Sequence, residues 1–192
     1  AKLPHPIGQH AMMHREGTLY IIGGQNGSKE LSSLWAYDIP SGDWTERAPM
    51  PTPRHSHAIA VTDDKLYVSG GRSAALGTEI DVVEVYDFAE NSWTTLPPMP
   101  TGRGGHGAFV RADRLHVFGG ESLSGKALIA GHDILDLKTL KWAAGKPMAK
   151  PRHGFAVGDS PARDEIYAIG GGARYGIHTI YSVTGTTQPI ED

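Results

Sequence analysis

The chain has 192 residues, of which 39% are hydrophobic and 20% charged, a composition typical of a folded globular protein and not of a disordered tail. Its 18 Lys and Arg and 21 Asp and Glu give a net charge of -3 spread along the whole length, which argues against nucleic-acid or anionic-membrane binding. There is no Cys, so disulfides, thiol catalysis and Cys-type zinc sites are excluded together.

Targeting and membrane segments are not evident. No apolar stretch approaches the roughly 20 residues that span a bilayer, so we expect no membrane insertion. The first residues, AKLPHPIG, lack the charged start and apolar run of a signal peptide. Because a processed protein has already lost such a segment, the sequence is compatible with the cytoplasm and with secretion or the periplasm.

A repeat with a period near 49 residues runs along the chain. Three residue types recur at intervals of 49: Trp44, Trp93 and Trp142; Met50, Met99 and Met148; Arg54, Arg103 and Arg152. Glycine pairs recur at 23–24, 70–71, 119–120 and 170–171. The chain therefore divides into repeats 1–53, 54–102, 103–151 and 152–192, and the last ends before any Trp.

Each repeat predicts short strands in the same order. The first repeat carries LYIIGG at 19–24, WAYD at 35–38 and a strand from Trp44; the second carries HAIAVT at 57–62, KLYVS at 65–69, VEVYD at 83–87 and SWTTL at 92–96. The third carries HGAFVR at 106–111, RLHVF at 114–118, ILDL at 134–137 and Trp142; the fourth begins with IYAIGG at 166–171. Short segments joined by turns rich in Gly, Asp and Asn predict a four-stranded antiparallel sheet per repeat.

A single sheet of this kind cannot bury both of its faces. Radial stacking of several sheets hides those faces, which is the propeller solution. We expect the repeated Trp and Tyr between blades, where they cover apolar area and still find partners for their polar tips. The repeated Asp38, Asp87 and Asp136 precede turns and are expected to accept hydrogen bonds from nearby backbone amides. The glycine pairs are expected to relieve crowding or to adopt positive φ.

The repeat resembles that of the kelch family. The strings LYIIGG…WAYDIPSGDW…APMPTPRHSHA and LYVSGG…EVYDFAENSW…PPMPTGRGGHGA follow the family pattern almost fully, whereas the third repeat has Leu135 in place of Tyr. The resemblance implies an all-β kelch-type β-propeller of four-stranded antiparallel blades. Family propellers usually close with six or seven blades, so four repeats imply a partial ring or a segment of a larger propeller, completed by further blades or by self-association. The alternative is a closed four-bladed ring that lacks one outer strand.

One end of this propeller is the predicted functional face. The longer links, at 25–32, 72–80, 121–131 and 172–177, and the returns between repeats lie at the same end, and binding residues concentrate on loops held by a rigid scaffold. The chain is therefore expected to be a binding module rather than an enzyme, without a cofactor, for a protein, an acidic peptide or a small anionic ligand. The candidate ligand contacts are Arg54, Arg103, Arg152, His55, His153, Arg72, Lys126, Arg174 and Tyr175.

The resemblance gives the repeated Arg a specific role. In kelch propellers that bind acidic peptides, the Arg of the return is among the ligand contacts, and guanidinium forks suit carboxylates and phosphates. The alternative is architectural: this Arg caps strand ends or pairs with an acid of the neighbouring blade. A carbohydrate-active propeller, similar to sialic-acid mutarotases or lectins, is the second functional alternative because it would bind an anionic sugar. The copper-oxidase type is excluded because it needs a Tyr-Cys pair.

Other motifs favour architecture over chemistry. His55 and His57 lie two apart on a predicted strand and would share a face, as metal ligands can. However, His10, His57 and His106 occupy one repeat position, which favours a structural role. The run IYAIGGGARYG lacks the glycine spacing of a dinucleotide-binding loop and precedes a strand-like segment. We predict no catalytic, metal or cofactor site.

Overall fold

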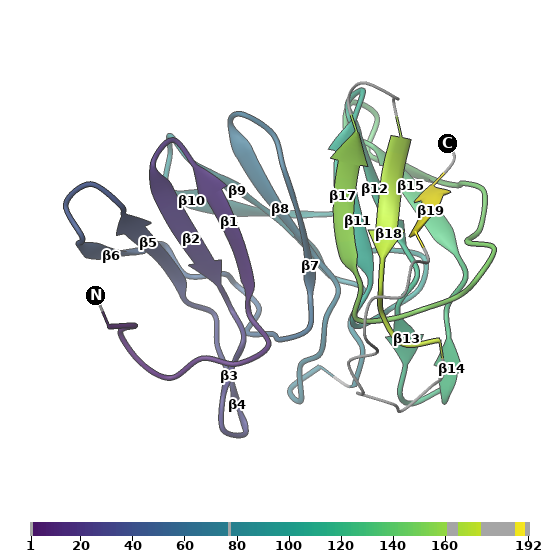
Figure 1. Ribbon diagram of the computed structural model, residues 1–192, viewed down its shortest axis with the longest axis horizontal. Helices are drawn as coiled ribbons and strands as arrows, with labels where there is room; N and C mark the ends of the chain where they lie inside the picture. The colour runs from purple at the N-terminus through teal and green to yellow at the C-terminus, as the bar shows by residue number, and fades with distance from the viewer. Residues whose placement is uncertain (1, 77, 161–164, 174–186, 191–192) are drawn as a thin grey trace.

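The computed structural model describes residues 2–76, 78–160, 165–173 and 187–190. Within these residues the chain forms β-strands and turns arranged as successive antiparallel sheets, or blades (Figure 1). None of the described segments is a helix that could cross a membrane. The predicted all-β fold is confirmed.

The first three blades have four strands each. They are β1 (Ala11–Arg15), β2 (Thr18–Ile22), β5 (Leu34–Asp38) and β6 (Trp44–Arg47); β7 (Ala58–Val61), β8 (Lys65–Ser69), β9 (Val83–Asp87) and β10 (Ser92–Leu96); and β11 (Gly107–Arg111), β12 (Arg114–Phe118), β15 (His132–Asp136) and β16 (Lys141–Ala144). The fourth blade has β17 (Ala156–Ser160), β18 (Glu165–Ile169) and β19 (Thr187–Ile190). Two links between second and third strands form hairpins, β3 (Gln25–Asn26) with β4 (Lys29–Glu30) and β13 (Glu121–Ser122) with β14 (Ala127–Leu128).

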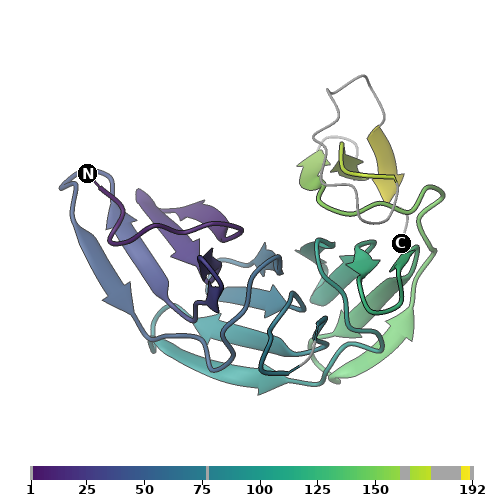
Figure 2. The same ribbon diagram turned by 90° about the horizontal axis from the view of Figure 1, so that it is seen from below.

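The blades follow one another along an arc. Figure 2 shows the first blade at one end of this arc and the fourth at the other, with the arc open between them. The innermost strands β7, β11 and β17 are neighbours in space. The structure is therefore a partial propeller, and the alternative of a closed four-bladed ring is wrong.

Three apolar layers hold the blades together. In the first layer, Ile22 and Leu34 of the first blade pack with Leu66 and Tyr86 of the second. The second layer joins the second and third blades, and the third layer joins the third and fourth. Each layer also contains the Met of one return: Met50, Met99 and Met148. The repeated Met thus seals the seam between neighbouring blades, where a flexible thioether side chain fills irregular gaps.

The repeated aromatic residues occupy the seams as expected. Trp93 packs against the first apolar layer and donates Nε1–H to the Ala48 carbonyl at 2.7 Å, while Trp142 donates to the Pro97 carbonyl at 3.1 Å. Tyr86 is fully buried and donates its hydroxyl to Asn91 at 2.6 Å. Large apolar area and a satisfied polar tip therefore coincide at these positions.

The repeated Asp residues shape the outer turns. Ser41 N–H donates to Asp38 at 2.8 Å, both Ala89 and Glu90 donate to Asp87, and Lys138 and Thr139 donate to Asp136. The pKa of each carboxyl is lowered: by backbone amides first at Asp38 and Asp136, and by the Lys65 ammonium first at Asp87. The predicted structural role of these Asp residues is confirmed.

The double glycine meets two demands at once. Gly70 and Gly71 have φ values of 54° and 98°, which strain any residue with a Cβ. A Cβ on Gly70 would lie 2.6 Å from the Arg103 carbonyl, and one on Gly71 would lie 2.6 Å from the His55 carbonyl. The backbone of the next return therefore passes over Gly70, and the backbone of the blade's own return passes over Gly71.

The start of the second blade differs from the expectation. The first strand was expected from His57, but β7 begins at Ala58 because Ser56 adopts a φ of 53° and breaks the extended chain. His55 is half-buried, forms an isolated bridge with Arg72 and lies outside the strand, whereas His57 is buried. The two imidazoles therefore do not share a strand face, and that prediction is wrong.

Candidate binding face

The long links and the returns lie at the same end of the blades. Each return bridges the residue that follows the glycine pair of its own repeat: Gly8 with Gln25, His55 with Arg72, Gly104 with Glu121, and His153 with Gly172. Figure 1 shows the β3–β4 and β13–β14 hairpins both at the lower end of the view. We call this end the long-link face.

Arg54 lies inside the second blade, below the long-link face. Its side chain is fully buried, and Nη2 pairs with Glu84 Oε2 at 2.6 Å. Nη1 donates to the Gly70 and Val82 carbonyls at 3.0 and 2.9 Å, and Nε donates to the Thr52 carbonyl at 3.2 Å. Burial lowers the pKa of Arg54, and the Glu84 carboxylate opposes that shift. The guanidinium thus ties the return to the ends of β8 and β9.

The same arrangement recurs at Arg103. Its Nη2 pairs with Asp133, and its Nη1 donates to the carbonyls of Gly119 and Gly131. Arg152 is also buried and donates Nη1–H to the Gly170 carbonyl at 2.7 Å. These contacts match the architectural alternative, with the acid supplied by the same blade and not by its neighbour. A ligand contact by these three guanidinium groups stays a prediction, and it requires their internal bonds to open.

The first blade lacks this ion pair. In the repeat register, Ile7 stands where the second blade has Arg54, and Trp35 stands where it has Glu84. Both charged residues are thus replaced together by apolar ones. The paired replacement is what a buried ion pair requires, because either charge alone would remain uncompensated.

A second charged group connects three blades at the long-link face. Arg72 Nη2 pairs with Glu121 Oε1 at 2.7 Å, and His153 Nδ1 lies 3.3 Å from the same oxygen. The Glu121 side chain is almost completely buried. The sequence pointed to Arg72 and His153 as candidate contacts but not to Glu121. Glu121 occupies the repeat position of Arg72 with the opposite charge, and this reversal is the pattern that could have revealed it.

A cavity of about 370 Å³ opens beside Arg72. It is lined by Glu30, His55, Arg72, Ala74 and Thr78, from the links of the first and second blades and the return between them. Glu30 accepts a hydrogen bond from the Ala74 amide at 3.1 Å, which joins the two links. Burial and then the Arg72 charge lower the pKa of His55, and its Nδ1 lies 3.0 Å from the Ser56 hydroxyl.

The remaining predicted contacts are less central. Lys126 is exposed in the β13–β14 turn, where it adopts a φ of 49°. Glu79 fixes this hairpin by accepting from the Leu123 amide at 2.7 Å and the Ser124 hydroxyl at 2.9 Å. Arg174 and Tyr175 lie outside the described residues.

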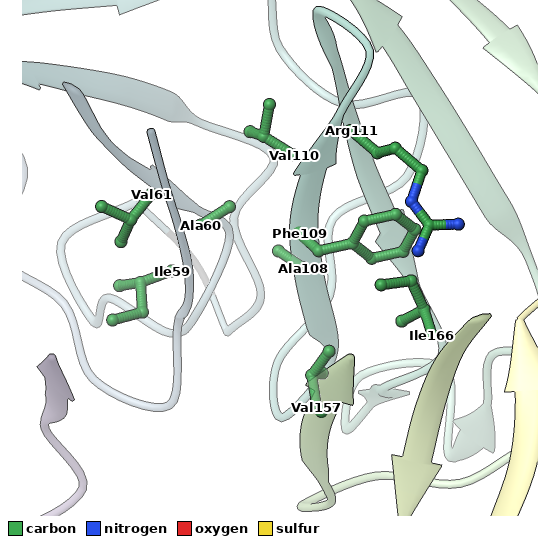
Figure 3. Close-up of a pocket in the computed structure, with 10 residues that line it drawn as sticks. Ile59, Ala60, Val61, Ala108, Phe109, Val110, Arg111, Val157 and Ile166 are labelled. Atoms are coloured by element: carbon green, nitrogen blue, oxygen red, sulfur yellow. The ribbon is translucent and has the colours of Figure 1, made fainter. Parts of the chain in front are cut away.

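A pocket of about 450 Å³ lies along the inner strands of the second, third and fourth blades (Figure 3). Figure 3 shows Ala60 of β7 pointing toward β11, and Ala60 and Val110 share the second apolar layer. Arg111 extends over the Phe109 ring, with 5.8 Å from Cζ to the ring centroid. The sequence did not predict this pocket because its walls meet only in the assembled arc. In the described part of the chain, no group of three or more His, Asp or Glu could hold a metal ion.

Comparison with known proteins agrees with this architecture. The chain matches the family described as the KLHDC2/KLHL20/DRC7 Kelch-repeats domain over residues 1–120 and again over residues 49–184. Kelch-like protein 25 of Xenopus laevis is 35% identical over 78 residues, which are 40% of this chain and 13% of that protein.

Two further relatives are similar over comparable lengths. Kelch-like protein 41a of Danio rerio is 35% identical over 71 residues, 36% of this chain and 12% of that protein. Kelch-like protein 30 of Homo sapiens is 35% identical over 71 residues, 35% of this chain and 11% of that protein. The matched segments thus span only a small part of these relatives. With a family match over most of its length and successive blades built on the same repeat, the chain belongs to the kelch-repeat family.

Proposed function

We propose that this chain is a binding module that recognises a protein partner, through a peptide segment, on the long-link face. The observation that carries the proposal is the cavity between the first and second blades, where His55, Arg72 and Glu30 present polar atoms around an open space. Loops held by a rigid scaffold are the usual place for such contacts.

The cavity is organised before a ligand arrives. The Arg72–Glu121 ion pair holds the guanidinium, and the Glu30 contact with the Ala74 amide holds the link that forms the wall. Side chains fixed in this way lose little freedom on binding, which favours affinity. An acidic peptide or an anionic sugar is the finer form of the proposal. Arg72 is the cation such a ligand would meet first, because Arg54 and Arg103 donate inside the blades.

Closing the cavity tests the proposal. Peptides of acidic, basic and uncharged composition, together with free sialic acid, would be titrated into the chain while binding is followed by calorimetry. We expect a peptide to bind, and Ala74→Trp to weaken it by about tenfold or more because the indole fills the cavity. Ala89→Trp, in an exposed outer turn of the same blade, is the matched control and should leave binding unchanged.

Three outcomes distinguish the alternatives. A peptide that binds Ala74→Trp as tightly as the unaltered chain would place the binding site elsewhere. Binding of sialic acid without any peptide would favour the carbohydrate-active alternative. Absence of binding by every probe would argue against the proposed function.

A further inference from the structure

The chain contains two asparagines, and the structure places their side-chain amides in opposite surroundings. Asn91 lies in an outer turn of the second blade, where its Oδ1 accepts hydrogen bonds from the Tyr86 hydroxyl at 2.6 Å and the Ala48 amide at 3.0 Å. Asn26 is exposed on the β3–β4 hairpin and is followed by Gly27. Among the described residues, none forms a hydrogen bond with the Asn26 side chain. The amide of Asn91 is therefore held in place, whereas that of Asn26 is not.

The turn of the β3–β4 hairpin leaves the Gly27 nitrogen accessible. Asn26 pairs with Lys29, so the hairpin turns over residues 27–28. Gly27 has a φ of 62°, and glycine at the first position of a two-residue turn is typical of type II′. A Cβ on Gly27 would meet no atom within 4 Å, and in the described part of the chain its N–H donates no backbone hydrogen bond. Neither a side chain of its own nor a hydrogen bond therefore shields this nitrogen.

The hairpin is small enough to open locally. Its strands form two residue pairs, Gln25 with Glu30 and Asn26 with Lys29. A two-stranded hairpin is marginally stable in water, and weakly held segments open far more often than a whole chain unfolds. In the open hairpin the backbone of Asn26 leaves its extended conformation, which allows Cγ to approach the nitrogen of the next residue.

We propose that Asn26 is a site of self-modification, at which the backbone nitrogen of Gly27 displaces the side-chain amide. A bond forms between the Gly27 nitrogen and Asn26 Cγ, and the bond between Cγ and Nδ2 breaks. Nδ2 leaves as ammonia with the proton of the Gly27 amide, and the product is a cyclic succinimide. Water then opens the ring at either of its carbonyls, which gives aspartate or isoaspartate at position 26.

The modification changes the long-link face. Both products carry a carboxylate in place of the neutral amide, and isoaspartate also adds a methylene group to the backbone, which disrupts the pairing with Lys29. The same hairpin holds Glu30, which accepts the Ala74 amide at 3.1 Å and lines the cavity between the first and second blades. We expect the hydrogen bond between Glu30 and Ala74 to weaken when isoaspartate forms. The reaction needs no bound partner, so it is independent of the proposed binding of a peptide.

Ageing of the folded chain in mildly alkaline buffer tests the proposal, with mass spectrometry of its proteolytic peptides as the readout. The variant Ser92→Gly, at an exposed position, places glycine after Asn91, so that both asparagines precede the same residue type. We expect Asn26 to lose its amide about tenfold faster than Asn91 or more, because the two hydrogen bonds of Asn91 must break before it can react. In urea, where both segments are unfolded, the two rates should be similar.

Two further measurements identify the chemistry and its consequence. Chromatography should resolve a mixture of aspartate and isoaspartate at position 26, because direct hydrolysis of the side chain would give aspartate alone. Hydrogen exchange at the Ala74 amide should be faster in the aged chain than in the fresh chain. Asn26→Gln is the matched control, because its longer side chain closes a ring far less readily. Exchange at Ala74 in this variant should not change with ageing.

Two results would overturn the proposed reaction: an Asn26 amide that survives as long as that of Asn91 in the folded Ser92→Gly chain, or aspartate without isoaspartate at position 26. Exchange at Ala74 that ageing leaves unchanged would overturn the effect on the long-link face.

Discussion

Arg54 and Glu84 form an ion pair inside the second blade, with 2.6 Å between Nη2 and Oε2 and both side chains excluded from water. The guanidinium also caps the carbonyls at the ends of two strands. The pair therefore joins the return between blades to the middle of the sheet.

Removing one partner of this pair should destabilise the chain strongly. Glu84→Ala leaves the Arg54 charge buried and uncompensated, and we expect the free energy of unfolding in urea to fall by about 3–5 kcal/mol. Lys138→Ala removes an exposed ion pair with Asp113 and serves as the control, with an expected loss below about 1 kcal/mol. Equal losses for the two variants would show that the buried pair has no special structural role.

His57 should make the chain sensitive to acid. Burial, with a smaller effect of the Arg54 charge, lowers the pKa of His57 from 6.5 to about 3. Between these pH values the unfolded chain binds a proton that the folded chain excludes, so stability is lost as the pH falls, by about 1.4 kcal/mol per pH unit from this residue.

The variant His57→Phe isolates this contribution. The free energy of unfolding, measured in urea between pH 7 and pH 4, should depend less steeply on pH in His57→Phe than in the unaltered chain. His10→Phe changes the exposed counterpart in the first blade and should keep the original slope. An unchanged slope in His57→Phe would mean that the imidazole takes up its proton as readily in the folded chain as in the unfolded chain.

The glycine pair should tolerate no side chain. Gly70→Ala combines positive φ with a Cβ placed 2.6 Å from the Arg103 carbonyl, whereas Gly27→Ala has a φ of 62° but no atom within 4 Å of its Cβ. We expect Gly27→Ala to destabilise by about 1 kcal/mol through backbone strain alone. Gly70→Ala should lower the free energy of unfolding clearly more than Gly27→Ala does, in both thermal and urea unfolding. Similar losses would show that the backbone of the return moves away without difficulty.

Trp93 and Trp44 should respond differently to the loss of the indole N–H. Trp93→Phe leaves the Ala48 carbonyl without its donor, whereas Trp44→Phe removes a donor that has no partner. Beyond the lost apolar area, we expect Trp93→Phe to destabilise by about 1 kcal/mol more than Trp44→Phe. Urea unfolding of the two variants measures the difference, and a reversed order would contradict the assignment of the seams.

Much of the fold follows from the repeat. The interval of 49 residues, the glycine pairs and the positions of Trp, Tyr and Asp predict the strands, their order and the residues between blades, because one local pattern recurs in four similar surroundings. The predicted boundary at His57 was wrong since Ser56 takes a left-handed conformation, and nothing in its residue type required that.

The candidate site could be predicted only in part. The alternation of short and long links predicts the long-link face and places His55 and Arg72 on it. It does not predict which group each charged side chain pairs with. Arg54 and Arg72 are both arginines near the same face. The first is enclosed by carbonyls of its own blade, whereas the second pairs with Glu121 of the next blade.

The sequence by itself determined that the chain is a kelch-type repeat protein whose longer links lie at one end of the blades. Only the tertiary structure decided which charges are buried and which cavity stays open. The physical reason is that strand formation depends on residues close together along the chain. Burial and charge pairing depend on which side chains the neighbouring blade places opposite. Leu3 and Met50 occupy the same repeat position, yet Leu3 is 45% exposed and Met50 is 2% exposed.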